Sequence, residues 1–143
     1  MLVTPLTRRQ FRDGRLIDDL APWAEATRRV AAEMRVPLVD LHARSTAAVQ
    51  AIGAAAATRF AQSPPSEAVL EAAATGTTIA ASTGAAPASA PAPQNNAAAE
   101  PMGQAKLAFD YTHVGPDGAD YFSAMVVEEL ARAVPALRPQ LIR

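Results

Sequence analysis

The order of apolar and polar residues predicts two short strands. An apolar run at residues 1–4 is followed by Pro5, which restricts the residue before it to extended backbone. Residues 36–41 form an apolar run broken by one carboxylate, a pattern typical of a buried parallel strand. The polar, basic stretch 6–14 ends in an Asp-Gly turn pair at 13–14, and it predicts a loop rather than a regular element.

A helical pattern lies between the two runs. Apolar residues recur there every three or four positions, which predicts an amphipathic helix that ends near Arg35. Asp18 or Asp19 can cap this helix, and Pro22 falls in its first turn, where a missing N–H costs nothing. The apolar stripe, which we expect to face the core, comprises Leu20, Trp23, Thr27, Val30, Ala31 and Met34.

Two further helices are predicted downstream. The first covers residues 43–60 and has Gly53 as its weak point, because glycine is a poor helix former. Its larger or capping positions are Ser45, Val49, Ile52 and Phe60. The second covers residues 116–134, with Pro116 and Asp117 in its first turn. Its expected core stripe is Ala119, Phe122, Val126, Leu130 and Val134.

The composition changes abruptly between these two helices. Residues 72–99 contain no charged side chain, and 13 of the 28 are alanine. Such a stretch has few large side chains to offset the entropy of ordering it, so we expect a disordered insertion. The chain then divides into a first α/β segment at 1–60, a low-complexity insertion at 61–105, and a final segment at 106–143.

The resulting order of strand, helix, strand, helix, insertion and helix predicts an α/β fold with a parallel sheet. Two parallel strands covered by helices leave both sheet edges open and normally belong to a larger sheet. We therefore expect the sheet to be incomplete, with strands on the N-terminal side missing.

Charge and cysteine content exclude several function classes. Thirteen Lys and Arg oppose 14 Asp and Glu, so there is no basic footprint for nucleic acid or an anionic membrane. The absence of cysteine excludes disulfide frameworks, thiolate metal sites and cysteine nucleophiles. No apolar run is long enough to cross a bilayer, and the first residues do not follow the order of a signal peptide.

The candidate chemistry centres on the two histidines, His42 and His113. Asp110 precedes His113 by three residues, and at this spacing its carboxylate can accept a hydrogen bond from Nδ1–H. That bond holds the tautomer in which Nε2 takes a proton, as in the base half of a catalytic triad. The competing interpretation is an exposed aspartate near a histidine at a helix start.

Three segments carry a family resemblance. Residues 109–119, FDYTHVGPDGA, resemble the last sequence block of the SGNH, or GDSL, hydrolases, where Asp and His precede a turn, a Gly-Ala pair and the final helix. Residues 3–11, VTPLTRRQF, and 36–42, VPLVDLH, resemble two consecutive strands in the rhamnogalacturonan acetylesterase branch of that superfamily. The resemblance covers roughly residues 1–60 and 106–134.

The resemblance implies a flavodoxin-like three-layer α/β/α domain that hydrolyses esters without a cofactor or a metal. The substrate class would be O-acetyl groups on a polysaccharide, or another small ester. His113 would be the general base that deprotonates a serine, and Asp110 would orient it. Tyr111 would be a candidate for stacking on a sugar ring. Members of the family are often exported, whereas this N-terminus shows no export signal, so the localisation is left open.

The chain also departs from the family pattern. No serine lies in the Gly-Asp-Ser context of the family's nucleophile, and the oxyanion-hole blocks are absent. The serines are Ser45, Ser63, Ser66, Ser82, Ser89 and Ser123. We therefore expect an esterase fragment that is inactive by itself, either the later part of a larger enzyme completed by another segment, or a chain that has lost activity.

Other interpretations stay open. His42 and Asp40 could form a metal site with Asp110 and His113. A hydrolytic zinc needs three protein ligands in fixed geometry, and the spacing of these residues does not supply a third ligand beside either pair. The arginines at 8–9 could steer an acidic substrate or lie in a solvated loop. In a different class altogether, the chain could be a non-catalytic interaction module that pairs through its open sheet edge.

Overall fold

The computed structural model describes residues 1–79 and 109–141. It is a mixed α/β structure with long helices and short strands, which confirms the general α/β class. The elements in chain order are β1 (Leu2–Val3), β2 (Phe11–Arg12), β3 (Arg15–Leu16), α1 (Ala21–Met34), β4 (Leu38–Val39), α2 (Leu41–Ala57), η1 (Thr58–Phe60), α3 (Glu67–Ala74), α4 (Pro116–Ala133) and η2 (Pro135–Gln140).

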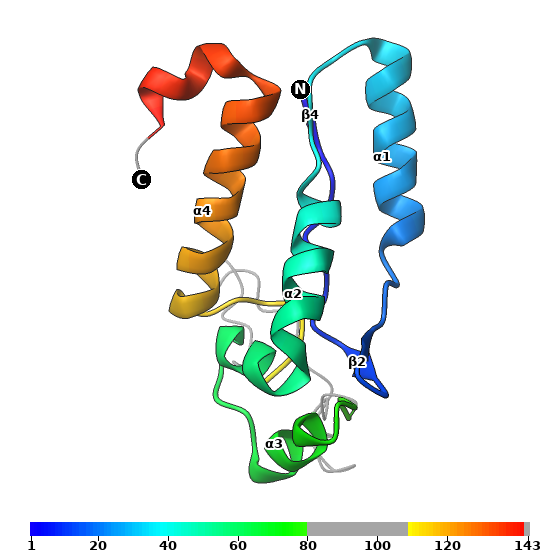
Figure 1. Ribbon diagram of the computed structural model, residues 1–143, viewed down its shortest axis with the longest axis vertical. Helices are drawn as coiled ribbons and strands as arrows, with labels where there is room; N and C mark the ends of the chain where they lie inside the picture. Colours follow the sequence, from blue (N-terminus) through cyan, green and yellow to red (C-terminus); the bar gives the residue numbers. More distant parts are fainter. Residues whose placement is uncertain (80–108, 142–143) are drawn as a thin grey trace, which may run out of the picture.

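Both predicted strands are present and pair in parallel. Leu2 lies opposite Leu38 and Val3 opposite Val39, so β1 and β4 form a two-stranded sheet. Figure 1 shows α1 on one side of this central pair and α4 on the other, and α1 contacts β1 while α4 contacts β4. The described part of the chain contains no third strand in this sheet.

The expected loop at 6–14 is wrong in its second half. Phe11 pairs with Leu16 and Arg12 with Arg15, which makes β2 and β3 an antiparallel hairpin. Its turn is the predicted Asp-Gly pair, and both residues have positive φ (50° at Asp13, 75° at Gly14), as tight hairpins require. Strand β2 escapes a pattern search because it is two residues long, although Phe11 is buried in the core.

Helix α1 forms where predicted but is not capped as predicted. Leu20 is the N-cap, and its hydrocarbon side chain makes no capping bond. The two candidate aspartates are bound elsewhere. Asp19 pairs with Arg8 at 2.6 Å, and Asp18 contacts the His42 ring at 2.9 Å. Pro22 lies in the first turn as expected, and Arg35 ends the helix in a left-handed conformation.

Three large residues of the predicted stripe of α1, Trp23, Val30 and Met34, face outward instead of into the core, whereas its member Ala31 is buried as expected. Trp23 and Met34 are 68% and 64% exposed, whereas the buried residues of the helix are Ala24 and Ala31. The helix approaches the strand pair with its alanines because small side chains allow the backbones to come close. Nothing in the described residues covers the larger side chains of the stripe.

Helix α2 confirms the predicted weak point. Gly53 adopts φ 78° and ψ 170°, which breaks the helix and turns its last residues toward η1. The N-cap is Asp40, whose side chain accepts the Ala43 N–H at 3.2 Å. The buried core assembles around α2 and comprises Phe11, Leu41, Val49, Ala54, Ala57, Phe60, Ala73, Phe122 and Met125.

The segment 61–105 begins with structure that its composition did not predict. Helix α3 is capped by Ser66 and packs Ala73 into the core, while residues 80–105 lie outside the described residues. Helix α4 matches the predicted final helix, although Ala119 is exposed and Gly118 takes the buried place beside it. None of the helices described here has the length and apolarity needed to span a membrane.

Candidate functional site

Asp110 and His113 meet in the loop before α4. One oxygen of the Asp110 carboxylate, Oδ1, accepts the backbone N–H groups of Thr112 at 2.7 Å and His113 at 2.6 Å. The other oxygen, Oδ2, lies 2.7 Å from Nδ1 of the His113 ring. The three-residue spacing lets one side chain close the turn and reach the imidazole at the same time.

This contact determines which nitrogen of His113 can react. A carboxylate with both oxygens engaged by donors can only accept, so Nδ1 carries the proton in this pair. Nε2 is then the basic nitrogen, and the side chain is 70% exposed. The arrangement can take a proton from a hydroxyl placed against it and hold the resulting imidazolium next to a carboxylate.

Asp110 is held in its charged form. Partial burial by itself would raise the pKa of this carboxyl, but the His113 ring and the two backbone N–H groups lower it, and the net pKa lies below its usual value. A carboxylate that stays ionised is the partner that the Nδ1–H tautomer needs.

Arg9 supports the same loop from inside the protein. Its guanidinium donates to the backbone carbonyls of His113 at 2.8 Å, Thr112 at 3.3 Å and Asp110 at 3.4 Å. Its backbone N–H donates to the Tyr111 carbonyl at 3.0 Å. Arg9 is 1% exposed, so it neither steers a substrate from the surface nor lies in a solvated loop as the sequence suggested.

The far end of the loop packs against η1. Gly115 donates its N–H to the Phe60 carbonyl at 2.9 Å, and Val114 bridges to Ala61. A β-carbon on Gly115 would lie 2.6 Å from the Ala61 carbonyl oxygen, so only glycine fits at this approach. These contacts fix the start of α4 relative to the core.

Tyr111 lies inside the protein rather than on its surface. It is 3% exposed, and its ring packs edge-on against Phe109 with centroids 5.0 Å apart. Its buried hydroxyl has no hydrogen-bond partner among the described residues, and burial raises its pKa. The ring therefore presents no free face on which a sugar could stack.

No serine hydroxyl within the described residues bonds to His113. Ser45 is fully buried and accepts the Thr7 N–H at 3.0 Å, Ser66 caps α3, and Ser123 donates to the Asp120 carbonyl. Ser82 and Ser89 lie outside the described residues. Among the described residues, the His113 ring forms one hydrogen bond, to Asp110.

His42 and Asp40 do not join the pair at Asp110 and His113. The buried His42 ring bonds Asp18, and Asp40 forms a two-bond ion pair with Arg28 at 2.8 and 3.0 Å. Within residues 1–79 and 109–141, no three His, Cys, Asp or Glu side chains gather as a metal site would require. Both residues instead tie the ends of strands and helices together.

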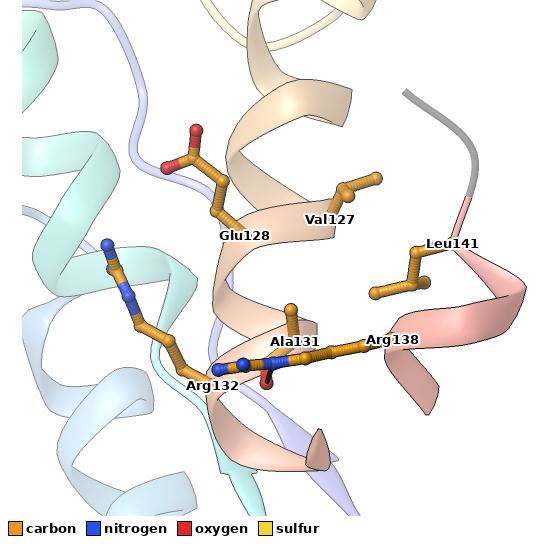
Figure 2. Close-up of a pocket in the computed structure, with 6 residues that line it drawn as sticks. All are labelled: Val127, Glu128, Ala131, Arg132, Arg138 and Leu141. Carbon is orange, nitrogen blue, oxygen red and sulfur yellow. Dashed lines mark hydrogen bonds between the residues drawn. The ribbon is translucent and has the colours of Figure 1, made fainter. Parts of the chain in front are cut away.

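A cleft of about 460 Å³ lies at the opposite end of α4, between α4 and η2. Figure 2 shows its lining residues, Val127, Glu128, Ala131, Arg132, Arg138 and Leu141. Its charged groups already have protein partners, because Glu128 pairs with Arg44, Arg132 pairs with Glu129, and Arg138 donates to the Ala131 carbonyl. The cleft therefore lacks a free group for chemistry and is separate from the Asp110–His113 pair.

Sequence reasoning found the pair but missed Arg9. A search for motifs detects residues three apart, whereas Arg9 lies more than 100 positions from the carbonyls that it binds. The only available signal was a basic residue just after a strand.

Comparisons with protein-family models, curated proteins and solved structures gave no match.

Proposed function

We propose that this chain provides the Asp–His half of a serine ester hydrolase of the SGNH type, acting on O-acetyl groups of a carbohydrate. The observation that carries the proposal is the 2.7 Å contact between Asp110 Oδ2 and His113 Nδ1 beside an exposed ring. His113 would deprotonate a serine hydroxyl and Asp110 would stabilise the imidazolium. The serine oxygen would attack the acetyl carbonyl and break the ester bond to the sugar, whose leaving oxygen would take the proton from His113. Water, deprotonated in turn by His113, would then hydrolyse the acetyl-serine to acetate and free serine.

The location of the pair supports this proposal. Thr4 follows β1 and Asp40 follows β4, and they share a hydrogen bond of 3.1 Å, so both strands end at one edge. In open α/β sheets, ligands bind beyond the carboxyl ends of the strands. Arg9 continues from β1 on this side and holds the Asp110 loop. The serine would come from a segment outside these 143 residues.

The test uses the native protein, tagged at its own chromosomal locus, with and without His113→Ala. We expect the wild-type protein to release acetate from an acetylated polysaccharide and to be labelled by a fluorophosphonate that modifies reactive serines. His113→Ala should lower kcat by about 10³-fold or more, because triad members act as a unit, and Asp110→Asn should lower it less.

Two outcomes would contradict the proposal. One is acetate release at an unchanged rate in His113→Ala, and the other is native protein without acetate release or labelling. The matched control is His42→Gln, which removes the other histidine without touching the proposed site. Intact mass of the tagged protein gives the length of the chain that carries the activity.

Among the described residues β1 pairs only with β4, and this open edge favours a second candidate, an interaction module that pairs with another strand. Val3 in β1 is 49% exposed, and α1, which carries the exposed Trp23 and Met34, contacts β1 and lies beside the strand pair in Figure 1. A two-stranded parallel sheet is marginal by itself, so an added strand would stabilise it. This candidate predicts stable association with a partner and no acetate release by the complex.

A further inference from the structure

Arg9 is a buried cation whose guanidinium contacts no carboxylate among residues 1–79 and 109–141. The three side-chain hydrogen bonds that Arg9 makes within the described part of the chain go to the backbone carbonyls of residues 110, 112 and 113, and the residue is 1% exposed. Burial lowers the pKa of Arg9, while the nearby charge of Asp110 opposes that shift. Removing a guanidinium from water costs free energy that an apolar side chain would not cost.

Arg9 binds backbone carbonyls of the loop before α4, and Asp110 binds backbone N–H groups of the same loop. The carbonyls of four consecutive residues, 110–113, accept from Arg9, three from its guanidinium and that of Tyr111 from its backbone N–H. The N–H groups of Thr112 and His113 donate to Asp110. The two peptide planes that join residues 111–112 and 112–113 are therefore held from both sides, which leaves the Asp110 carboxylate little freedom to turn away from the His113 ring.

We infer that Arg9 is a positioning residue, which keeps the Asp110 carboxylate aligned with Nδ1 of His113 and so selects the tautomer with a free, basic Nε2. Without the guanidinium, the loop carbonyls lose their buried donors and the Asp110 turn loosens. The imidazole then loses the acceptor that favours Nδ1–H. The catalytic role of this tautomer rests on the proposed function. The inference that Arg9 favours the tautomer does not depend on that function.

The test measures the His113 tautomer in the 143-residue chain by ¹H–¹⁵N correlation spectra of the imidazole, at a pH where the ring is neutral. We expect wild-type His113 to be in the Nδ1–H form. Arg9→Met should shift it toward a mixture with the Nε2–H form, because methionine fills similar volume but donates no hydrogen bond. Arg9→Lys should give an intermediate shift, because one ammonium cannot serve three carbonyls in a fork.

Arg8→Met is the matched control. Arg8 is the neighbouring arginine, and its side chain is 41% exposed and paired with Asp19 on the surface. The control should leave the His113 spectrum unchanged. A merely stabilising role of Arg9 would lower the melting temperature but would leave the tautomer of the folded fraction as in wild type.

Three results would overturn the inference: a wild-type tautomer in folded Arg9→Met and Arg9→Lys, an equal shift in Arg8→Met, or a predominant Nε2–H form in wild type. If neither Arg9 variant folds, the test is the exchange of the Arg9 guanidinium N–H protons with solvent in the wild-type protein. We expect slow exchange, because these protons are bonded to buried carbonyls, and rapid exchange would contradict the inference. In active native protein, Arg9→Lys should lower kcat by about 10²-fold with KM unchanged. Failure of the proposed function would remove that activity but not the tautomer shift.

Discussion

Gly118 allows α4 to approach η1 more closely than any other residue would. A β-carbon at this position would lie 2.7 Å from the Phe60 carbonyl oxygen and 2.9 Å from the Val114 β-carbon. Alanine usually stabilises a helix interior by about 1 kcal/mol relative to glycine. At Gly118 the contact with a backbone oxygen makes alanine destabilising instead, because η1 cannot move without disturbing the core residue Phe60.

We therefore predict that Gly118→Ala lowers the free energy of unfolding by about 1–2 kcal/mol, the range expected for overpacking. Urea denaturation followed by circular dichroism measures the change. Ser123→Ala, on the exposed side of the same helix, is the control and should change stability by less than about 0.5 kcal/mol. A Gly118→Ala protein as stable as the control would show that α4 and η1 can separate without cost.

At the residue scale, the sequence predicts contacts between residues that are close neighbours in the chain. The pair at Asp110 and His113 is one turn of backbone, so its spacing alone makes the contact possible. Arg9, Tyr111 and Trp23 were assigned to the wrong environment, because their burial depends on elements far away in the chain.

At the scale of elements, the break at Gly53 sets the direction of the last residues of α2, which ends at Ala57. Its φ of 78° with ψ near 170° is accessible only to glycine without strain, and a β-carbon there would meet no atom within 4 Å. Any cost of substitution therefore comes from the backbone and not from a clash. The break matters because η1 and Phe60 follow directly and supply the surface against which the loop before α4 packs.

Gly53→Ala is expected to cost about 1–3 kcal/mol of unfolding free energy, the usual range for a strained backbone. Chemical denaturation provides the measurement, with exposed Ala51→Ser in the same helix as the control. Equal stability of Gly53→Ala and the control would mean that α2 continues straight without loss.

Helix positions were read well from the sequence, and helix orientations less well. The spacing of apolar residues placed α1, α2 and α4 within a few residues of their ends. The spacing included Ala31 in the stripe of α1, but it did not reveal that Ala24 is buried while Trp23 and Met34 are exposed, because alanine contributes little to an apolar stripe. The β2–β3 hairpin was missed for a different reason, since strands of two residues have no period to detect.

For the whole molecule, Asp40 connects the sheet to two helices. Its carboxylate accepts from Thr4 after β1, from Arg28 on α1 and from the first turn of α2. The Arg28 hydrogen bond lowers the pKa of Asp40 most, burial opposes the shift, and the Ala43 and Thr4 bonds lower it further. The folded protein therefore binds a proton at Asp40 less readily than the unfolded chain does.

The sign of the pH dependence follows from that difference. The stabilisation from Asp40 is complete above the pKa of an unfolded aspartate, about 4, and is lost as the pH falls through the lower folded value. Asp110 contributes in the same direction, because its pKa is lowered as well. We predict that the free energy of unfolding falls steadily below about pH 4.

Asp40→Asn should be less stable than wild type by about 1 kcal/mol at pH 7, since the pair with Arg28 is lost while asparagine can still cap α2. The difference should shrink as the pH falls below about 4. Urea unfolding at several pH values measures both curves. Asp120→Asn, at an exposed position without an ion pair among the described residues, is the control. A difference that stays constant with pH would contradict the assignment to Asp40.

The sequence by itself determined what depends on short-range order: the parallel strand pair, the helix positions, the Asp-Gly turn at 13–14, the weak point at Gly53 and the local turn that joins Asp110 to His113. Periodicity, turn chemistry and glycine stereochemistry act within a few residues, so they can be read from the chain. Only the tertiary structure decided that Arg9 is buried under that turn, that Tyr111 is enclosed, and that Trp23 and Met34 of α1 face outward. Those outcomes depend on which elements meet, and contacts between residues 100 positions apart leave no pattern in one sequence.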